Sequence, residues 1–458
     1  MSQYKTPGVY VEEKSVLPGS VAGVSTAVPA FIGYTGGESN LVDKAVKVST
    51  LKQYEDTFGK GSSAAFIVEV TDMEEKAFTA TAPESADLMY YAMQMFFSNG
   101  GQSCYVVSVA DKTSKESYSN ALNALELEDE PTLIVLVDAV NLPVSKNYYT
   151  LCDEVLTQCN KMKDRFGIFD VIPLNDYLPA PAADKDIFEL FRTDIGSNNL
   201  KYGAAYYPYL KSGIQYYYNE NDLEITIPDP ADSTKTKKVK LNDSIFTTEN
   251  TELYNLIKKK LESIYVTLPP SSAVAGAYVS TDRDRGVWKA PANTGLTSVL
   301  EPAVKLTELE NDGMNVDPTG GKSVNAIRSF TGKGTLIWGA RTLAGNDNEW
   351  RYISVRRLFN YVEESIQKAT SFAVFEPNNA MTWLKLRSMI ESFLDTLWRE
   401  GALAGGKPED AYFVQVGLGT TMTPQDILEG KLIIKIGLAA VRPAEFIILE
   451  FTHKLQES

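Results

Sequence analysis

The sequence predicts two fold classes in one chain, an α/β region followed by an α+β region. Continuous apolar runs at residues 133–137 and 166–172 are bounded by turns, as in parallel strands that are covered on both faces. A stretch of helical period, residues 148–163, lies between them, which is the order expected of a β-α-β unit. Two amphipathic helices, within residues 355–369 and 386–397, mark the later region.

The N-terminal residues 1–20 predict a strand that lacks a partner. TPGVYVEE alternates apolar and polar residues around Val9 and Val11. Pro7-Gly8 precedes this alternating stretch and Pro18-Gly19 follows it. A short strand between such breakers cannot bury itself, so it must pair with another strand in its own chain or in a neighbour. We therefore expect Val9, Tyr10 and Val11 to form a strand that the chain donates.

Residues 27–281 have an α/β pattern, with one segment that differs. Further strands are expected at residues 30–34, 104–109 and 201–207, and a helix at 85–98. The differing segment, residues 211–262, alternates like paired strands around a Pro-Asp-Pro turn and then continues into a short helix. This predicts a β-hairpin decoration. Its basic cluster KTKKVK is a candidate phosphate-binding patch, but the acidic residues around it favour a solvated strand edge.

The C-terminal part predicts a second unpartnered strand. A helix at residues 380–398, capped at Asn378 or Asn379, precedes two strand-like runs at 431–441 and 445–451. The last run, EFIILEF, is strongly apolar and lies close to the C-terminus, so it also needs a partner strand. The residues expected to form this donated strand are Phe446, Ile447, Ile448 and Leu449.

Composition excludes several classes of function. The 458 residues include 44 Lys+Arg, 59 Asp+Glu and one His, for a net charge of −15, which argues against nucleic acid or an anionic membrane as partner. A Ser–His–Asp site could use only His453, and a zinc site with two His is excluded. The start has no apolar signal-peptide core, and no apolar run reaches the ~18 residues of a membrane span. We therefore expect a protein made and assembled in the cytoplasm, without membrane insertion.

Motifs that are similar to chemical sites have simpler structural interpretations. Gly320-Gly321-Lys322-Ser323 is similar to a phosphate-binding loop, but Val316 stands where that motif needs its first Gly. The segment 282–285, Asp-Arg-Asp-Arg, pairs carboxylates as a glycosidase or metal site would, yet its interleaved Arg residues favour a structural ion-pair network. Three sparse Cys predict buried free thiols. We expect no catalytic residue, metal or cofactor.

Several ordered blocks of the sequence resemble the contractile tail sheath proteins of contractile-tailed phages, R-type pyocins and extracellular contractile injection systems. TPGVYVEE resembles the family's N-terminal arm. TDRDRGVWKAPAN, at residues 281–293, and NAIRSFTGKGTLIWGARTL, at 325–343, are similar to family signatures. The strongest match runs from residue 350 to 414 and includes WRYISVRRLFNYVEESI, FEPNN and LWREGALAGG. Residues 211–262 match nothing in the family, as expected of a variable insertion.

The resemblance implies a structural subunit and no enzyme. Six protomers would form a ring around an inner tube, rings would stack helically, and contraction from a metastable extended state would drive the tube through a target envelope. The implied partners are further copies of the chain, the inner tube protein, and baseplate and terminator or cap proteins. Assembly is expected in the bacterial or phage-infected cytoplasm, within a particle that is then released or membrane-anchored.

The resemblance also implies a division of the chain. The implied parts are an N-terminal arm at 1–20, an outer α/β domain of subtilisin-like topology at 21–318 that carries the insertion, an inner α+β domain at 319–443, and a C-terminal strand arm at 444–458. Lys385 and Arg387 on the helix at 380–398 are the candidates for holding the tube, and a plain surface role for these two charges is equally open.

Charge is distributed unevenly along the chain. Residues 321–458 hold 16 basic and 15 acidic side chains, whereas residues 1–320 hold 28 and 44. This predicts that the acidic part faces solvent and that the nearly neutral part packs against tube and neighbours. Two other classes remain open: a hydrolase built on the central α/β region, for which His453 would have to complete the site, and a non-contractile surface-array or filament protein.

Overall fold

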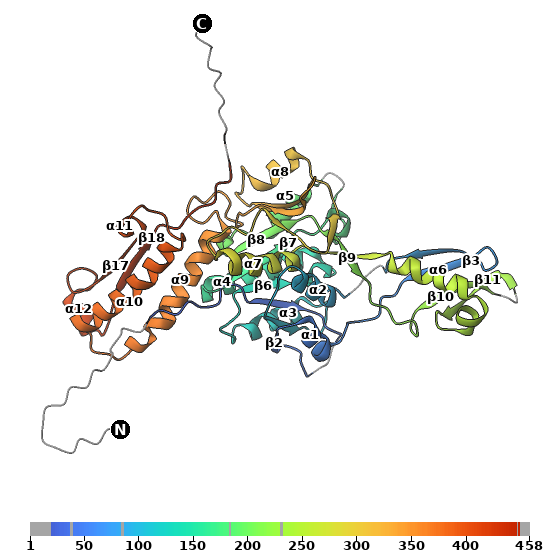
Figure 1. Ribbon diagram of the computed structural model, residues 1–458, viewed down its shortest axis with the longest axis horizontal. Coiled ribbons are helices and arrows are strands. Elements are labelled where there is room, and N and C mark those ends of the chain that lie inside the picture. Colours follow the sequence, from blue (N-terminus) through green and yellow to red (C-terminus); the bar gives the residue numbers. More distant parts are fainter. Residues whose placement is uncertain are drawn as a thin grey trace, which may run out of the picture. The chain divides into compact units, whose positions relative to one another are not determined.

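The computed structural model describes residues 20–36, 40–83, 87–182, 185–229, 232–446 and 448 (Figure 1). The chain forms two compact units. The small unit comprises residues 1–24 and 362–441, and the large unit comprises residues 25–361 and 442–458. No helix in the described part of the chain is both long and apolar enough to span a membrane.

A nine-stranded sheet organises the large unit. Its strands, in spatial order, are β13 (Thr294–Gly295), β16 (Gly334–Trp338), β15 (Val324–Phe330), β8 (Gly203–Tyr207), β7 (Phe166–Asp170), β6 (Leu133–Leu136), β1 (Pro29–Gly33), β5 (Cys104–Ser108) and β2 (Ala45–Val48). The five strands β5-β1-β6-β7-β8 are parallel and follow the 2-1-3-4-5 order of a doubly wound sheet. All five are buried at every residue, which explains their continuous apolar sequences.

Helices cover both faces of this sheet. α3 (Lys115–Leu125) and α4 (Ser145–Met162) carry the chain from β5 through β6 to β7, whereas α2 (Met89–Ser98) carries it from β1 to β5 in the opposite direction. Because such crossovers are right-handed, α2 lies on the other face. There it packs against α7 (Ser271–Arg285). Cys104, Cys152 and Cys159 are buried and free in this core, as predicted.

A second hydrophobic core is formed jointly by the insertion and by residues 64–70. Here β11 (Asp232–Lys240), β10 (Glu224–Asp229), β3 (Ile67–Asp72) and β4 (Ala77–Thr81) form a four-stranded sheet, whose buried residues pack against α6 (Thr251–Glu262). The predicted hairpin is confirmed as β10–β11, and its basic edge is solvated, with Lys238 paired to Glu224 at 3.0 Å. The recruitment of β3 and β4, from more than 140 residues upstream, is a feature that the sequence pattern did not indicate.

Shorter elements complete the large unit. They are α1 (Leu51–Phe58), α5 (Ile187–Asp194) and α8 (Glu308–Asn315), a π-helical turn (Ile245–Glu249), and the three-stranded sheet β12 (Tyr265–Leu268), β9 (Leu210–Gln215) and β14 (Val299–Pro302).

The small unit is an α+β structure. Its main helix, α10 (Ala380–Arg399), packs against β17 (Tyr412–Val416), which pairs with β18 (Ile434–Leu438). As predicted, Asn379 caps α10, since its side chain accepts hydrogen bonds from the backbone N–H groups of Met381 and Thr382. α11 (Pro408–Ala411) and α12 (Pro424–Leu428) lie in the connections.

The division between the units differs from the predicted boundary at residue 319. It falls within α9 (Ile353–Thr370), between residues 361 and 362. The reason is that β15 is hydrogen-bonded in parallel to β8, with Val324 opposite Ala205, so residues 324–338 belong to the large sheet. Helix α2 also begins later than predicted, at Met89.

Candidate assembly site

The Glu445 carboxylate binds the last described part of the chain to the large unit. Glu445 accepts hydrogen bonds from Arg341 Nε and Nη2, each at 2.8 Å, from Asn315 Nδ2 at 2.6 Å and from the Tyr352 hydroxyl at 3.1 Å. Although burial opposes ionisation, the hydrogen bonds from Arg341 and Asn315 hold the pKa of Glu445 below its ordinary value. We call Arg341, Asn315 and Tyr352 the Glu445 socket.

The socket is fixed from behind by the large sheet. Arg341 has a side chain that is 4% exposed, and its Nη1 donates to the Asn315 carbonyl at 3.2 Å. Asn325 of β15 binds the backbone of Arg341 on both sides, accepting from its N–H at 2.8 Å and donating to its carbonyl at 2.8 Å. The guanidinium is therefore positioned by strand β15 and not only by its carboxylate partner.

Just past the socket the chain exposes apolar residues. Phe446 is 69% and Ile448 is 82% exposed. Neither residue, nor Glu445, is in a strand, so the predicted run at 445–451 forms no strand at the positions that the structure describes. Ile447 and Leu449 lie outside the described residues, as do Val9, Tyr10 and Val11.

The candidate tube-facing charges both have partners within the small unit. Lys385 Nζ lies 4.5 Å from the centroid of the Phe372 ring, and Arg387 Nε lies 2.7 Å from a Glu391 carboxylate oxygen. Positions two apart on a helix differ by about 200° in direction, so Lys385 and Arg387 lie on opposite flanks of the exposed face of α10. The structure does not bring them together.

The centre of that exposed face is apolar near its start. Met381 is 75% and Leu384 is 59% exposed, and just before the helix Val374 is 64% exposed. Phe375 is fully exposed and has a positive φ of 68°, which is unusual for an aromatic residue. Exposed apolar residues that cluster in sequence in this way mark interaction surfaces. The helical stripe predicted the buried face of α10, but nothing in its period indicated this exposed set.

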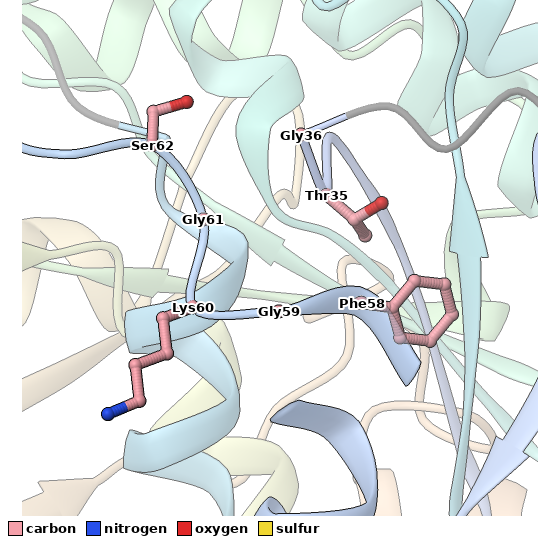
Figure 2. Close-up of a pocket in the computed structure, with 7 residues that line it drawn as sticks. All are labelled: Thr35, Gly36, Phe58, Gly59, Lys60, Gly61 and Ser62. Carbon is pink, nitrogen blue, oxygen red and sulfur yellow. The ribbon is translucent and has the colours of Figure 1, made fainter. Parts of the chain in front are cut away.

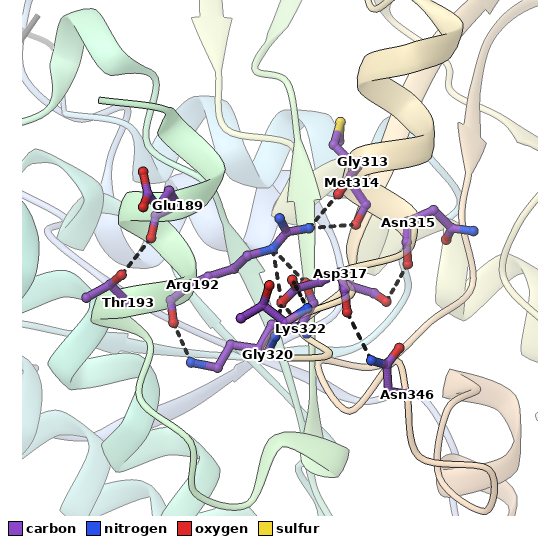
Figure 3. Close-up of polar contacts among 12 residues, drawn as sticks. Glu189, Arg192, Thr193, Gly313, Met314, Asn315, Asp317, Gly320, Lys322 and Asn346 are labelled. Atoms are coloured by element: carbon purple, nitrogen blue, oxygen red, sulfur yellow. Dashed lines mark hydrogen bonds and ion pairs between the residues drawn. The ribbon is translucent and has the colours of Figure 1, made fainter. Parts of the chain in front are cut away.

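The Gly-Gly-Lys-Ser loop is occupied by the protein's own carboxylate (Figure 3). Asp317 accepts from the backbone N–H groups of Thr319, Gly320 and Lys322, each at 3.1 Å. Burial opposes ionisation of Asp317, but these three bonds hold its pKa below the ordinary value. The Lys322 ammonium donates to the Arg192 carbonyl, away from the loop. The groups that would bind a phosphate are thus already engaged.

The segment 282–285 forms the predicted ion pairs, with one unexpected partner. Asp284 pairs with its neighbour Arg283 at 2.8 Å, whereas Asp282 binds Arg357 of α9 through two hydrogen bonds of 2.9 and 2.5 Å. The Arg357 guanidinium also lies over the Tyr278 ring, 4.8 Å from its centroid. This buried pair links α7 to α9.

A pocket of about 280 Å³ lies just beyond the carboxyl end of β1 (Figure 2). Thr35 and Gly36 line one side and residues 58–62 the other. The Thr35 hydroxyl is hydrogen-bonded to the Ser108 hydroxyl at 2.7 Å, and Lys60 is the one charged residue of the lining. This set offers neither a nucleophile with a base nor a pair of carboxylates. Among the described residues no cluster of His, Cys, Asp or Glu is arranged to bind a metal ion.

This chain is similar to chains of solved structures over its whole length. A chain of an extracellular contractile injection system, in the cryo-EM structure of its PVC sheath complex in the contracted state, is 32% identical with a TM-score of 0.68, and the match covers 100% of this chain and 99% of that one. The contracted helical sheath of the anti-feeding prophage gives 30% identity, a TM-score of 0.67, and coverage of 98% and 100%. A chain of the six-fold symmetrised baseplate of the same prophage gives 29%, 0.67, and 99% and 100%.

A family model matches the C-terminal part of the chain, and two curated sequences match 188 residues of it. Residues 345–454 match the model of the phage tail sheath C-terminal domain. The tail sheath protein of Enterobacteria phage T4 is 26% identical over 188 residues, which cover 40% of this chain and 27% of that protein. The tail sheath protein of Vibrio phage KVP40 is 25% identical over 188 residues, covering 40% and 26%. The chain thus spans about a quarter of the length of the curated relatives it matches.

Proposed function

Because this chain belongs to the family of contractile tail sheath proteins, we propose that it is the structural subunit of a contractile sheath. It polymerises as stacked hexameric rings around an inner tube, and contraction from a metastable extended state drives the tube through a target envelope. The observation that carries this function is the match along the full chain, at 32% identity, to a chain of a contracted sheath complex. The chemistry of the described pockets and loops offers no competing site.

The proposed partners are further copies of the chain, the inner tube protein, the baseplate and a terminator or cap protein. Similarity to a chain of the anti-feeding prophage baseplate structure supports the baseplate contact. Assembly takes place in the cytoplasm, needs no cofactor and involves no catalysis. The parallel sheet of the large unit is the outer, subtilisin-like part in this proposal, and the small unit is the inner part.

Both ends of the chain act as strand donors in this proposal. Val9, Tyr10 and Val11 supply one strand, and residues 446–449 supply the other, by addition to a sheet edge of a neighbouring subunit. Exposure of Phe446 and Ile448 supports the second donation, because most of each apolar side chain is left uncovered in the single subunit. At about 3.3 Å per residue a 12-residue arm reaches roughly 40 Å, enough to reach an adjacent subunit.

Deletion of residues 1–15 tests the sheath function. The truncated chain should stay folded and unassembled, because the deleted segment contributes a strand only between subunits. Electron microscopy of particles co-expressed with their tube protein measures the outcome, with the full-length chain as control. Normal sheaths from the truncated chain would contradict the arm, whereas absence of sheaths from the full-length chain would contradict the function itself.

The tube contact is assigned to the exposed face of α10. We place its centre at Met381 and Leu384, with Lys385 and Arg387 on the flanks, because a dry apolar centre with a charged rim is the usual anatomy of an interface. Leu384→Asp should reduce the number of tubes found inside sheaths while the subunit stays folded. Ser388→Asp, one turn further along the same exposed face, is the matched control. Equal loss in both variants would argue against an apolar centre.

A hydrolase remains the rival class for the parallel sheet. The chain's single His, His453, would have to complete a serine-protease site. Labelling of the purified protein with a serine-directed fluorophosphonate separates the two functions, and we expect none. A non-contractile array is separated by imaging the sheath under several conditions, since a contractile sheath shows two lattices and an array shows one.

A further inference from the structure

Glu445 forms a buried, bidentate ion pair with Arg341 close to the last described residues. Most ion pairs among the described residues lie at the surface, such as Lys211–Glu301, whose side chains are 50% and 41% exposed. The Arg341 side chain is 4% exposed and meets both oxygens of Glu445 in a bidentate pair. Bidentate pairs of Arg and a carboxylate are among the stronger hydrogen-bonded contacts in proteins. Removing the carboxylate from such a buried pair destabilises the fold, because it leaves the guanidinium charge unpaired.

The position of Glu445 along the chain gives these bonds a role. Val441 is the last residue of the small unit, and its N–H donates to the Ala402 carbonyl at 3.2 Å. Only Arg442, Pro443 and Ala444 separate it from Glu445, which belongs to the large unit. The exposed residues Phe446 and Ile448 follow directly. With Glu445 in its socket the terminal segment starts from the large unit, and without it the segment would start from Val441 in the small unit.

We propose that the Glu445 socket is an anchor that makes residues 446–458 leave the chain from the large unit, at one fixed point, for delivery to a second copy of this protein. This inference rests on the proposed sheath function and specifies how one of its contacts is positioned. The recipient is a second copy because the segment after the anchor is apolar, because its described residues Phe446 and Ile448 are largely exposed, and because the family assembles from copies of itself.

Anchoring raises the efficiency of such a contact. A strand that starts from a fixed point samples a smaller volume than one on a tether four residues longer, so its effective concentration at the recipient edge is higher. The 13 residues after Glu445 can extend roughly 43 Å at about 3.3 Å each. Preformation of the socket by Asn325 lowers the ordering cost further, because Arg341 is held in place before the carboxylate arrives.

Glu445→Gln tests the anchor, with Glu301→Gln as the matched control from an exposed pair of the large unit. In the isolated subunit, a nitroxide spin label at Ile448→Cys should give a narrower, more mobile spectrum in Glu445→Gln than with Glu445 present, because the amide lacks the charge that binds Arg341. Co-expressed with the tube protein, the same variant should leave roughly tenfold less of the chain in sedimentable sheaths. The control should match the wild type in both measurements.

Two further variants keep the test decisive. Asn315→Ala removes one socket donor without leaving a buried charge unpaired, so it should fold normally and give a smaller loss of sheaths in the same direction. Deletion of residues 446–458 should abolish the sheaths. Wild-type yields from Glu445→Gln and Asn315→Ala, or from the deletion, would overturn the anchor while leaving the sheath function intact. Failure of the wild-type chain itself to form sheaths would overturn the function.

Discussion

Two buried carboxyl groups at the carboxyl ends of the parallel strands bind neighbouring segments of the chain through hydrogen bonds. Asp138, after β6, accepts from the N–H groups of Tyr34 at 2.9 Å and Leu88 at 2.6 Å. Asp170, at the end of β7, accepts from the N–H of Ser271 at 2.8 Å and from its hydroxyl at 2.6 Å. Burial raises the pKa of each carboxyl to about 7. Perturbed carboxyls often mark active sites, but here both are engaged in fastening loops and the start of α7.

These carboxyls predict a dependence of stability on pH. The folded protein keeps a proton on Asp170 up to about pH 7, whereas the unfolded chain releases it near pH 3.8. The contribution of each of these two carboxyls to the free energy of unfolding should therefore be greatest below about pH 4 and fall as pH rises to 7, by up to about 4 kcal/mol. Asp170→Asn should flatten this slope. Urea unfolding from pH 5 to pH 8 measures it, with the exposed Asp284→Asn as control, and an unchanged slope in Asp170→Asn would contradict the assignment.

At the scale of elements, the contact between α2 and α7 depends on one glycine. A Cβ at Gly276 would lie 2.6 Å from the Phe96 carbonyl oxygen, a distance at which the two helices must move apart. The sequence of α7 is rich in small residues for the same reason: it packs against α2 on one side and the sheet on the other.

Gly276→Ala should therefore destabilise the large unit by about 1–3 kcal/mol, the usual cost of overpacking. Gly313→Ala is the matched control, because Gly313 also lies in a helix but has no atom within 4 Å of the added Cβ. The control should be neutral or stabilising by about 0.5–1 kcal/mol, since alanine favours helix. Thermal unfolding of the two variants compares them, and equal melting temperatures would refute the close contact.

An element could be predicted where the pattern that specifies it lies within consecutive residues, and could not be predicted where it depends on residues far apart in the sequence. β1, β5, β6, β7 and β8 and helices α4, α9 and α10 were predictable because burial on both faces, or on one stripe, is written into consecutive residues. The pairing of β3 with β10 was not, because it joins Val68 to Ile225 and four of the five parallel strands lie between these residues in the sequence. The division into compact units at residues 361 and 362 was not predictable for a related reason, since the sequence of β15 does not indicate which strand it pairs with.

The candidate site was predictable only in part. The terminal run EFIILEF is apolar in sequence, and its described residues Phe446 and Ile448 are exposed. Its first residue, Glu445, gave no sign of its role, because the Arg that binds it lies 104 residues upstream. The charges Lys385 and Arg387 were conspicuous in sequence, yet the helix turns them to opposite flanks.

At the scale of the whole molecule, the uneven charge makes a prediction about the assembly. Residues 1–320 carry the acidic excess, and residues 321–458 are nearly neutral. Like charges repel when subunits are stacked, so the acidic surface should face solvent and the neutral surface the tube. A cryo-EM map of the assembled sheath tests this directly, and a tube-facing wall dense in Asp and Glu would contradict it.

The separate core of the insertion makes this protein a scaffold for multivalent display. The β10–β11 ladder is regular from Glu224–Lys240 to Pro228–Thr236 and shifts its register beyond Pro228, and exposed loop tips are the sites at which proteins tolerate inserted domains. A foreign binding domain grafted there would be supported by the hydrophobic core that the insertion shares with β3 and would leave the parallel sheet unaltered. Every subunit of an assembled sheath would then carry one copy, and a modest individual affinity would become strong avidity for a repetitive surface.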